Sequence, residues 1–228
     1  MKKLAITAAV LACATSIVSA QVTSANIVGY GKVDAVAGLQ LGSMQFNNGN
    51  ANTLDSIFGD LYPLGTKILT YDGGYTFSTY AISYPPPNYT PVEGWSVGIP
   101  SLEPGQGFWI QLPLDAVGNY ESIMSGEVPL GDAVTNSIVS GLNLLSYPYP
   151  VEMEIQDLGF TPTLGDKIFV YSNAGGYTTV SYAISYPPPN YTPVEGWSLP
   201  TLKIPVGGGF WYQTATPATW IATRPFTP

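Results

Sequence analysis

Side chains that could recognise or transform a ligand gather in a 17-residue stretch that occurs twice in the chain. The stretch YAISYPPPNYTPVEGWS runs from Tyr80 to Ser96 and again, letter for letter, from Tyr182 to Ser198. Tyrosine rings with hydroxyl groups, set near a carboxylate, are residue types with which protein surfaces recognise polar partners. The candidate ligand-binding residues are therefore Tyr84, Tyr89, Glu93, Tyr186, Tyr191 and Glu195.

The identity of the two copies is also compatible with roles other than binding. Each stretch could fold back onto its own module as a lid, with Tyr84 and Tyr89 packed on proline rings above Trp95. The stiff proline segments could instead contact a neighbouring subunit. A recent duplication would produce the same identity without any selection for binding.

The carboxylates in the stretch also have a purely structural interpretation. Glu93 and Glu195 are the only acidic residues that match between the aligned copies, and Lys67 and Lys167 are the only matched basic residues. One surface ion pair in each copy is the corresponding expectation, and such a pair is worth about 0 to 1 kcal/mol.

Residue types that the chain lacks exclude the commonest catalytic arrangements. It contains no histidine, and its single cysteine is Cys13 near the amino terminus. A Ser-His-Asp triad and histidine-ligated zinc are thereby excluded. A glycosidase that uses two carboxylates roughly 5 to 10 Å apart is a less favoured hypothesis, because each copy supplies only one matched carboxylate. We therefore predict a non-catalytic protein with no cofactor and no metal site.

Charge and composition limit the partners that the chain can recruit. The formal net charge is −8, only 10% of residues are charged, and 16 residues are tyrosine. Without a basic patch, nucleic acid and anionic membrane are poor partners. An extracellular glycan or a surface protein is the expected partner, and the oligomeric state stays open. A structural subunit of an extracellular layer or fibre is the alternative function.

The twin stretch is the centre of a longer internal repeat. The segment from Leu64 to Tyr80 aligns with that from Leu164 to Tyr182, and GFWIQ from Gly107 aligns with GFWYQ from Gly209. Repetition on this scale indicates tandem copies of one structural unit. We predict a β module at residues 21–131 and a second, homologous module at residues 132–228.

Each module has the pattern of small β structures. Short apolar runs such as KILTY and KIFVY end at glycine-containing turns, and 25 glycines and 21 prolines punctuate the chain. This pattern predicts an all-β fold of two sandwich- or barrel-like modules. One short helix of two or three turns is expected in NTLDSIFGDL, where Asn52 or Thr53 can cap it and Leu54, Ile57, Phe58 and Leu61 share a face.

Within the twin stretch, the prolines predict where the strand ends. Pro85, Pro86 and Pro87 donate no backbone hydrogen bond, so the strand from Tyr75 should stop at Tyr84 and continue as a polyproline-like arm.

Four tryptophans match between the modules and are expected in the core. They are Trp95, Trp109, Trp197 and Trp211. Phe108 and Phe210 alternate with two of them, so one member of each Phe-Trp pair should face outward or toward the other module.

Together these motifs resemble a family of exported two-module β proteins of the Verrucomicrobia and their relatives. The resemblance covers nearly all of the chain after its first 20 residues, with anchors at Gly29-Tyr30, Gly141 to Pro148, Gly209 to Trp211 and Trp220 to Phe226. The chain departs from the family pattern in its first module, which has no counterpart of Trp220 or Arg224. The family has no assigned activity, so the resemblance implies fold and export alone.

The amino terminus predicts where the protein acts. Residues 1–20 combine Lys2 and Lys3, an apolar run and the small-residue end Val18-Ser19-Ala20, which is the pattern of a secretory signal peptide. No transmembrane segment is expected, and the mature protein should be secreted or held at the cell surface. Attachment of a lipid to Cys13 is the less favoured alternative.

Overall fold

The computed structural model describes residues 27–227, and nearly all regular structure within them is β-strand. The predicted all-β fold is confirmed. The signal peptide predicted at residues 1–20, and Cys13 within it, lie outside the described residues. Between residues 27 and 227, no helix has the length and apolar character needed to cross a membrane.

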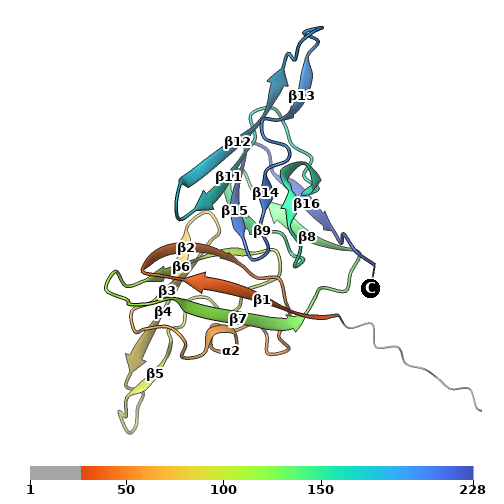
Figure 1. Cartoon of the computed structure of the whole chain (residues 1–228). Helices are drawn as coiled ribbons and strands as arrows, with labels where there is room; N and C mark the ends of the chain where they lie inside the picture. Colours follow the sequence, from red (N-terminus) through yellow and green to blue (C-terminus); the bar gives the residue numbers. More distant parts are fainter. Residues whose placement is uncertain (1–26, 228) are drawn as a thin grey trace, which may run out of the picture.

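Two five-stranded antiparallel sheets form the body of the molecule (Figure 1). The first has the order β2-β6-β3-β4-β5, and the second has the order β13-β12-β11-β15-β9. The strands of the first are β2 (Gly38–Ser43), β3 (Lys67–Tyr71), β4 (Tyr75–Ser83), β5 (Val92–Trp95) and β6 (Gly107–Leu112). Those of the second are β9 (Gly141–Ser146), β11 (Lys167–Ser172), β12 (Gly176–Ser185), β13 (Val194–Trp197) and β15 (Gly209–Thr214).

Three two-stranded antiparallel ribbons complete the fold. They pair β1 (Val28–Ala35) with β7 (Tyr120–Glu127), β8 (Ala133–Ile138) with β16 (Ala218–Thr223), and β10 (Met153–Glu154) with β14 (Lys203–Ile204). The first two ribbons each join the first and last strands of one half of the chain. We call residues 28–127 the first repeat and residues 133–223 the second repeat. The five-stranded sheets and the ribbons that join the first and last strands correspond in the two repeats, and the topology therefore suggests a tandem arrangement. The β10–β14 ribbon belongs to the second repeat and has no counterpart among the described strands of the first.

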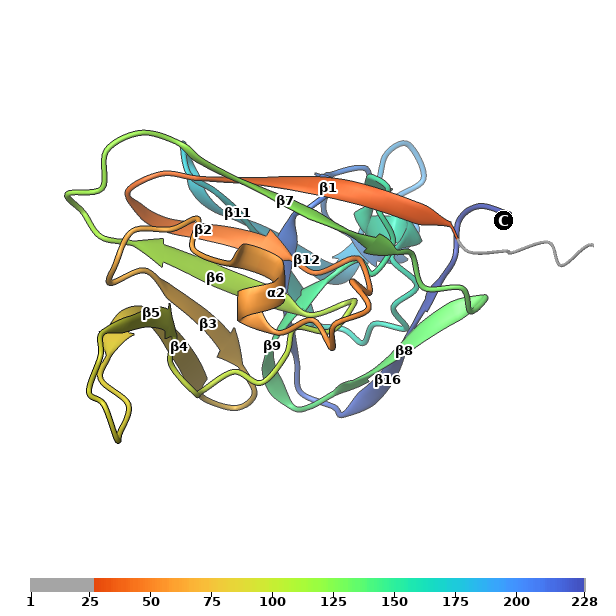
Figure 2. The ribbon, with the colours of Figure 1, turned by 90° about the horizontal axis from the view of Figure 1, so that it is seen from below.

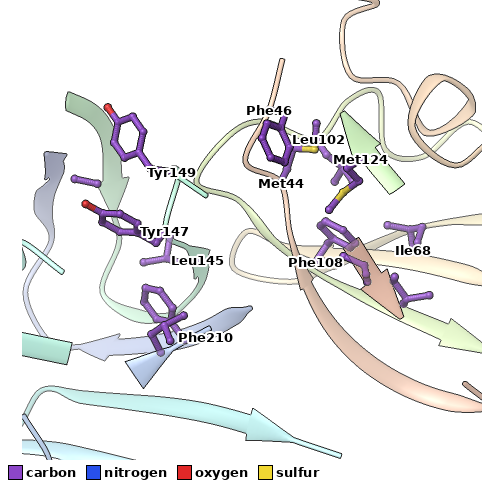
Figure 3. Close-up of a cluster of buried hydrophobic side chains, with 14 of the residues drawn as sticks. Met44, Phe46, Ile68, Leu102, Phe108, Met124, Leu145, Tyr147, Tyr149 and Phe210 are labelled. Carbon is purple, nitrogen blue, oxygen red and sulfur yellow. The ribbon is translucent and has the colours of Figure 1, made fainter. Parts of the chain in front are cut away.

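A buried cluster of apolar side chains fills the space between each ribbon and its sheet, and it continues from one repeat into the other. Figure 3 shows Phe46, Phe108 and Met124 on one side of this cluster, with Tyr149 and Phe210 on the other. Full burial of an apolar side chain of this size stabilises a fold by about 1.5 to 3 kcal/mol. Such contacts hold a chain that has no cysteine among its described residues.

The helix is shorter than the sequence predicted. α2 spans only Leu54–Phe58, and the side chain of Thr53 caps it by accepting a hydrogen bond from the Ser56 amide. Gly59 ends it with φ of +51°, a conformation in the left-handed region that favours glycine. Figure 2 shows α2 between the β1–β7 ribbon and the pair β4–β5. The second repeat has only a 3₁₀ turn, η1 (Ile155–Asp157), at the corresponding place.

The strands β6 and β15 are covered on both faces, which explains their continuous apolar sequences. Phe108 and Phe210 point into the main core, whereas Trp109 and Trp211 form a second cluster where the two sheets meet. In each Phe-Trp pair the tryptophan therefore faces the other repeat, which is the second of the two orientations expected from the sequence.

The two repeats are also joined by polar contacts. The Ser146 amide donates to the Gly105 carbonyl at 2.9 Å, across the junction between the sheets. Arg224 reaches back to the segment between the repeats, where Nη1 donates to the Leu130 carbonyl at 2.6 Å and Nη2 pairs with Asp132 at 3.1 Å. These contacts give Arg224, which has no counterpart in the first repeat, a structural role.

Candidate functional site

Each copy of the 17-residue stretch folds as a β-hairpin that extends beyond the body of the molecule. We call residues 80–96 the first hairpin and residues 182–198 the second hairpin. In both, the leading tyrosine pairs with the tryptophan near the end of the stretch, and the register is the same. Figure 1 shows the two hairpins at opposite ends of the molecule, pointing away from each other.

The tips of the hairpins are closed turns, so the predicted polyproline-like arm is wrong. The Tyr89 amide donates to the Pro85 carbonyl at 3.1 Å, and the Tyr191 amide donates to the Pro187 carbonyl at the same distance. The strand ends at Ser83, one residue earlier than expected. In each hairpin the serine before the tip also donates its hydroxyl to the opposite valine carbonyl at 3.2 Å. Proline rings and these bonds together make each tip stiff.

The tyrosines at the tips face solvent and do not form a lid. Tyr84 and Tyr186 are 59% and 60% exposed, and Tyr89 and Tyr191 are 67% and 66% exposed. The ring partners of Trp95 are instead Phe58, Tyr62 and Tyr80. The two-residue period places Tyr80, Ile82 and Tyr84 on one face of the hairpin, but of these three only Tyr80, at its base, is buried.

The two matched glutamates lie on the strands β5 and β13, where both are exposed. The Tyr80 hydroxyl donates to Glu93 Oε2 at 3.4 Å, and burial followed by the nearby Glu93 charge raises the pKa of Tyr80. The predicted ion pair is wrong, because none of the salt bridges in residues 27–227 joins Glu93 to Lys67 or Glu195 to Lys167. Lys67 Nζ lies instead 5.4 Å from the centre of the Phe77 ring.

A hollow of about 380 Å³ beside the first hairpin contains a carboxylate that the sequence did not single out. Asp55 of helix α2 lines it together with Glu93 and Trp95. Both carboxylates are exposed, whereas a glycosidase keeps one carboxyl protonated by burial. Glu93 and Glu195 are not brought together, since they lie on hairpins at opposite ends of the molecule (Figure 1).

The bases of the two hairpins differ although their sequences are identical. Trp95 contacts the rings of Phe58, Tyr62 and Tyr80, and its indole N–H donates to the Gly59 carbonyl at 3.2 Å. Trp197 contacts one ring, that of Tyr182, at 5.3 Å. The extra contacts come from α2 and the chain that follows it. The first hairpin is thus held more firmly than the second.

The structure forms a second candidate site, an aromatic cleft of about 580 Å³, where the two repeats meet. It is lined by Tyr71, Tyr75, Leu142, Phe169, Tyr177, Thr179 and Trp211. Trp211 is 5% exposed and forms the floor, whereas Tyr75 and Tyr177, at 57% and 52%, form the rim. Burial, followed by the neighbouring phenols of Tyr177 and Tyr71, raises the pKa of Tyr75.

Reciprocal ring contacts join the two sheets at this cleft and next to it. The Tyr71 ring of the first repeat packs edge-to-face on Trp211 of the second, with 5.0 Å between centroids. The Tyr171 ring of the second repeat packs in the same way on Trp109 of the first, at 4.9 Å. The backbones come close beside these rings, since a Cβ on Gly107 would lie 2.7 Å from the Leu145 carbonyl oxygen. Only glycine allows that approach.

Sequence reasoning missed the cleft because its residues come from six strands of two repeats. Matched aromatic pairs, such as Tyr75 with Tyr177, were a signal that could have found it. Alternation within one strand indicates only that such side chains lie on a common face. It does not reveal that the corresponding faces of two sheets meet.

Comparisons with protein-family models, with curated proteins and with solved structures found no match to this chain. The resemblance to exported two-module proteins therefore stays an expectation from sequence.

Proposed function

We propose that this is an exported, non-catalytic binding protein, made of two β modules, whose twin hairpins attach it to a protein partner at or outside the cell surface. The observation that carries the proposal is that four tyrosines at the tips are exposed to solvent. They are Tyr84 and Tyr89 in the first hairpin and Tyr186 and Tyr191 in the second, and the same hydrogen bond closes both tips. Export is inferred from residues 1–20, and the modules from the internal repeat.

The fold does not need these tyrosines, which supports a binding role. Surface substitutions away from structural features usually change stability by less than about 0.5 kcal/mol. Tyr89 and Tyr191 moreover have φ values of +51° and +52°. A left-handed conformation costs a non-glycine residue roughly 1 to 2 kcal/mol, so stability alone would favour glycine or asparagine at these tips.

The shape of the tips favours a protein over a glycan as the partner. A projecting tip presents convex aromatic and proline surface, which fits a pocket or groove on another protein. Tyrosine offers much contact area at a small entropic cost because its side chain has few rotatable bonds. The stiff tip loses little further freedom on binding, which lowers the cost of association.

The opposed hairpins also predict the valency of the protein. Two equivalent tips that point in opposite directions cannot engage neighbouring sites on one flat surface, because only one tip faces that surface. They can bind two separate partner molecules and hold them together. We propose that the protein bridges its partners, with the two hairpins binding independently.

The test begins with a screen of immobilised extracellular proteins and polysaccharides against the purified protein. Beads coated with a protein that binds should aggregate when the protein is added. The variant Tyr84→Ala/Tyr89→Ala, or its twin Tyr186→Ala/Tyr191→Ala, should still bind the beads but no longer aggregate them, and the fourfold variant should not bind. Binding that survives the fourfold substitution in a folded protein would refute the proposal.

An assembly role is the second candidate, and the sheet edges favour it. The strands β5 and β13 are outermost in their sheets, and an outermost strand offers free backbone groups to another chain. Copies joined through opposite ends would form a linear array. Sedimentation would then show a size that rises with protein concentration. A constant monomeric size would remove this candidate and leave the bridging proposal intact.

A further inference from the structure

We propose that the aromatic cleft between the repeats is a binding site for a neutral saccharide. Its volume of about 580 Å³ lies within the range of ligand pockets, roughly 300 to 1,000 Å³. The site is separate from the hairpins, and this inference does not rest on their function.

The polar groups of the cleft are free to meet a ligand. No hydrogen bond within residues 27–227 engages the hydroxyls of Tyr71, Tyr75, Tyr177 or Thr179. These hydroxyls can both donate and accept hydrogen bonds. The cleft therefore combines apolar ring surface with uncommitted hydroxyl groups around it.

The charge and shape of the cleft select the class of ligand. None of its lining residues carries a charge, so it offers nothing to a phosphate, a carboxylate or an ammonium group. A pyranose ring has apolar C–H faces and hydroxyl groups at its edge. Trp211 at the floor matches the C–H face, and Tyr75 and Tyr177 at the rim can stack on the ring and meet its hydroxyls.

A wholly apolar ligand fits less well. A lipid chain or a steroid would leave the rim hydroxyls without partners once water was displaced, and an unsatisfied polar group that becomes buried costs free energy. The site is also open at the rim, where the two tyrosines are more than half exposed at 57% and 52%. A short oligosaccharide can extend from the floor past this rim into solvent.

The pseudo-equivalent positions of the two repeats supply a matched pair of variants. The aligned strands place Phe77 in the first repeat where the second repeat has Thr179. Thr179 lines the cleft, and both side chains are exposed in their strands. Thr179→Phe should therefore fill the cleft with a ring that the fold accepts at the equivalent position. Phe77→Thr is the reciprocal change outside the cleft.

The experiment is calorimetric titration of the purified protein with neutral oligosaccharides of glucose, mannose, xylose and galactose. We expect at least one of them to bind one site per chain with micromolar to millimolar affinity. Tyr75→Ala and Tyr177→Ala should each weaken binding by about two- to tenfold, which is the loss that corresponds to one aromatic contact of roughly 0.5 to 1.4 kcal/mol. Thr179→Phe should abolish binding.

Controls separate this site from the hairpins and from misfolding. Phe77→Thr and the tip variant Tyr84→Ala should bind as the unaltered protein does, and near-ultraviolet circular dichroism should show that all variants are folded. Absence of binding to every oligosaccharide, or unchanged binding by folded Thr179→Phe, would overturn the inference. So would preferential binding of an anionic saccharide or of an apolar dye to the same tyrosines. None of these outcomes bears on the bridging by the hairpins.

Discussion

Substitution of the two tryptophans of the twin stretch tests whether the surroundings of a residue outweigh its local sequence. Trp95 and Trp197 occupy the same position in identical stretches. Both are half-buried against the main core. A judgement from the stretch alone would assign Trp95→Ala and Trp197→Ala the same loss of stability.

The structure predicts unequal losses. Trp95 makes two more ring contacts than Trp197, with Phe58 and Tyr62, and it also donates to the Gly59 carbonyl. Each aromatic pair is worth about 0.5 to 1.5 kcal/mol, and a hydrogen bond adds a similar net amount. Since both indoles are half-buried, values near the lower end apply. Trp95→Ala should therefore lower the free energy of unfolding by about 2 kcal/mol more than Trp197→Ala.

Guanidinium denaturation of the two variants measures this difference, provided that the slopes of the unfolding transitions agree. For a chain of this length, a further loss of 2 kcal/mol corresponds to a melting temperature lower by about 4 to 8 °C. The variant Trp95→Phe, which keeps a ring but lacks the indole donor, should fall between Trp95→Ala and the unaltered protein. Equal losses for the two alanine variants, within about 0.5 kcal/mol, would refute the reasoning.

Three further predictions follow from the packing. Gly98→Ala should destabilise the protein by about 3 kcal/mol or more in denaturant titration, because its Cβ would clash with the Phe77 carbonyl oxygen. Gly74→Ala, where a Cβ would meet no atom within 4 Å, is the control and should cost under about 1 kcal/mol. Tyr62→Phe should be neutral or stabilising at pH 7, since the buried Tyr62 hydroxyl approaches that of Ser122 without forming a hydrogen bond of good geometry. Because burial raises the pKa of Tyr62 to about 12, the native state favours the neutral phenol. The contribution of this pKa difference to the free energy of unfolding should be complete below pH 10 and lost between pH 10 and 12. A fluorescence-detected pH titration should show a smaller alkaline loss of stability for Tyr62→Phe than for the unaltered protein, and an identical loss would contradict this. Tyr84→Ala should change the free energy of unfolding by less than about 1 kcal/mol, and a larger loss would mean that the tip is structural.

The candidate residues of the twin hairpins could be predicted from the sequence, but the exposure of their side chains could not. Repetition of the stretch singled out Tyr84, Tyr89 and Glu93, and the prolines indicated a stiff end to the strand. Whether Tyr84 covers Trp95 or faces solvent depends on where the hairpin lies relative to the body. That position is decided by contacts of β4 with β3 and β5, which are set by pairing between separate segments.

The sequence by itself determined the strands and their repetition. Period-two alternation, glycine-ended apolar runs and the duplicated segments are local features, and the backbone geometry that they favour follows from a few neighbouring residues. The all-β fold and the Phe108–Trp109 alternation on β6 could be predicted for that reason.

Only the tertiary structure decided where the matching residues of the two repeats lie and which side chains they contact. The sheets meet with Tyr71 on Trp211 and Tyr171 on Trp109, and the cleft lies beside the first of these contacts. The hairpins point to opposite ends of the molecule (Figure 1). Helix α2 packs beside the first hairpin and has only a 3₁₀ turn as its counterpart in the second repeat. These differences depend on segments that are distant along the chain, because the burial of a side chain is a property of the neighbours that folding brings together.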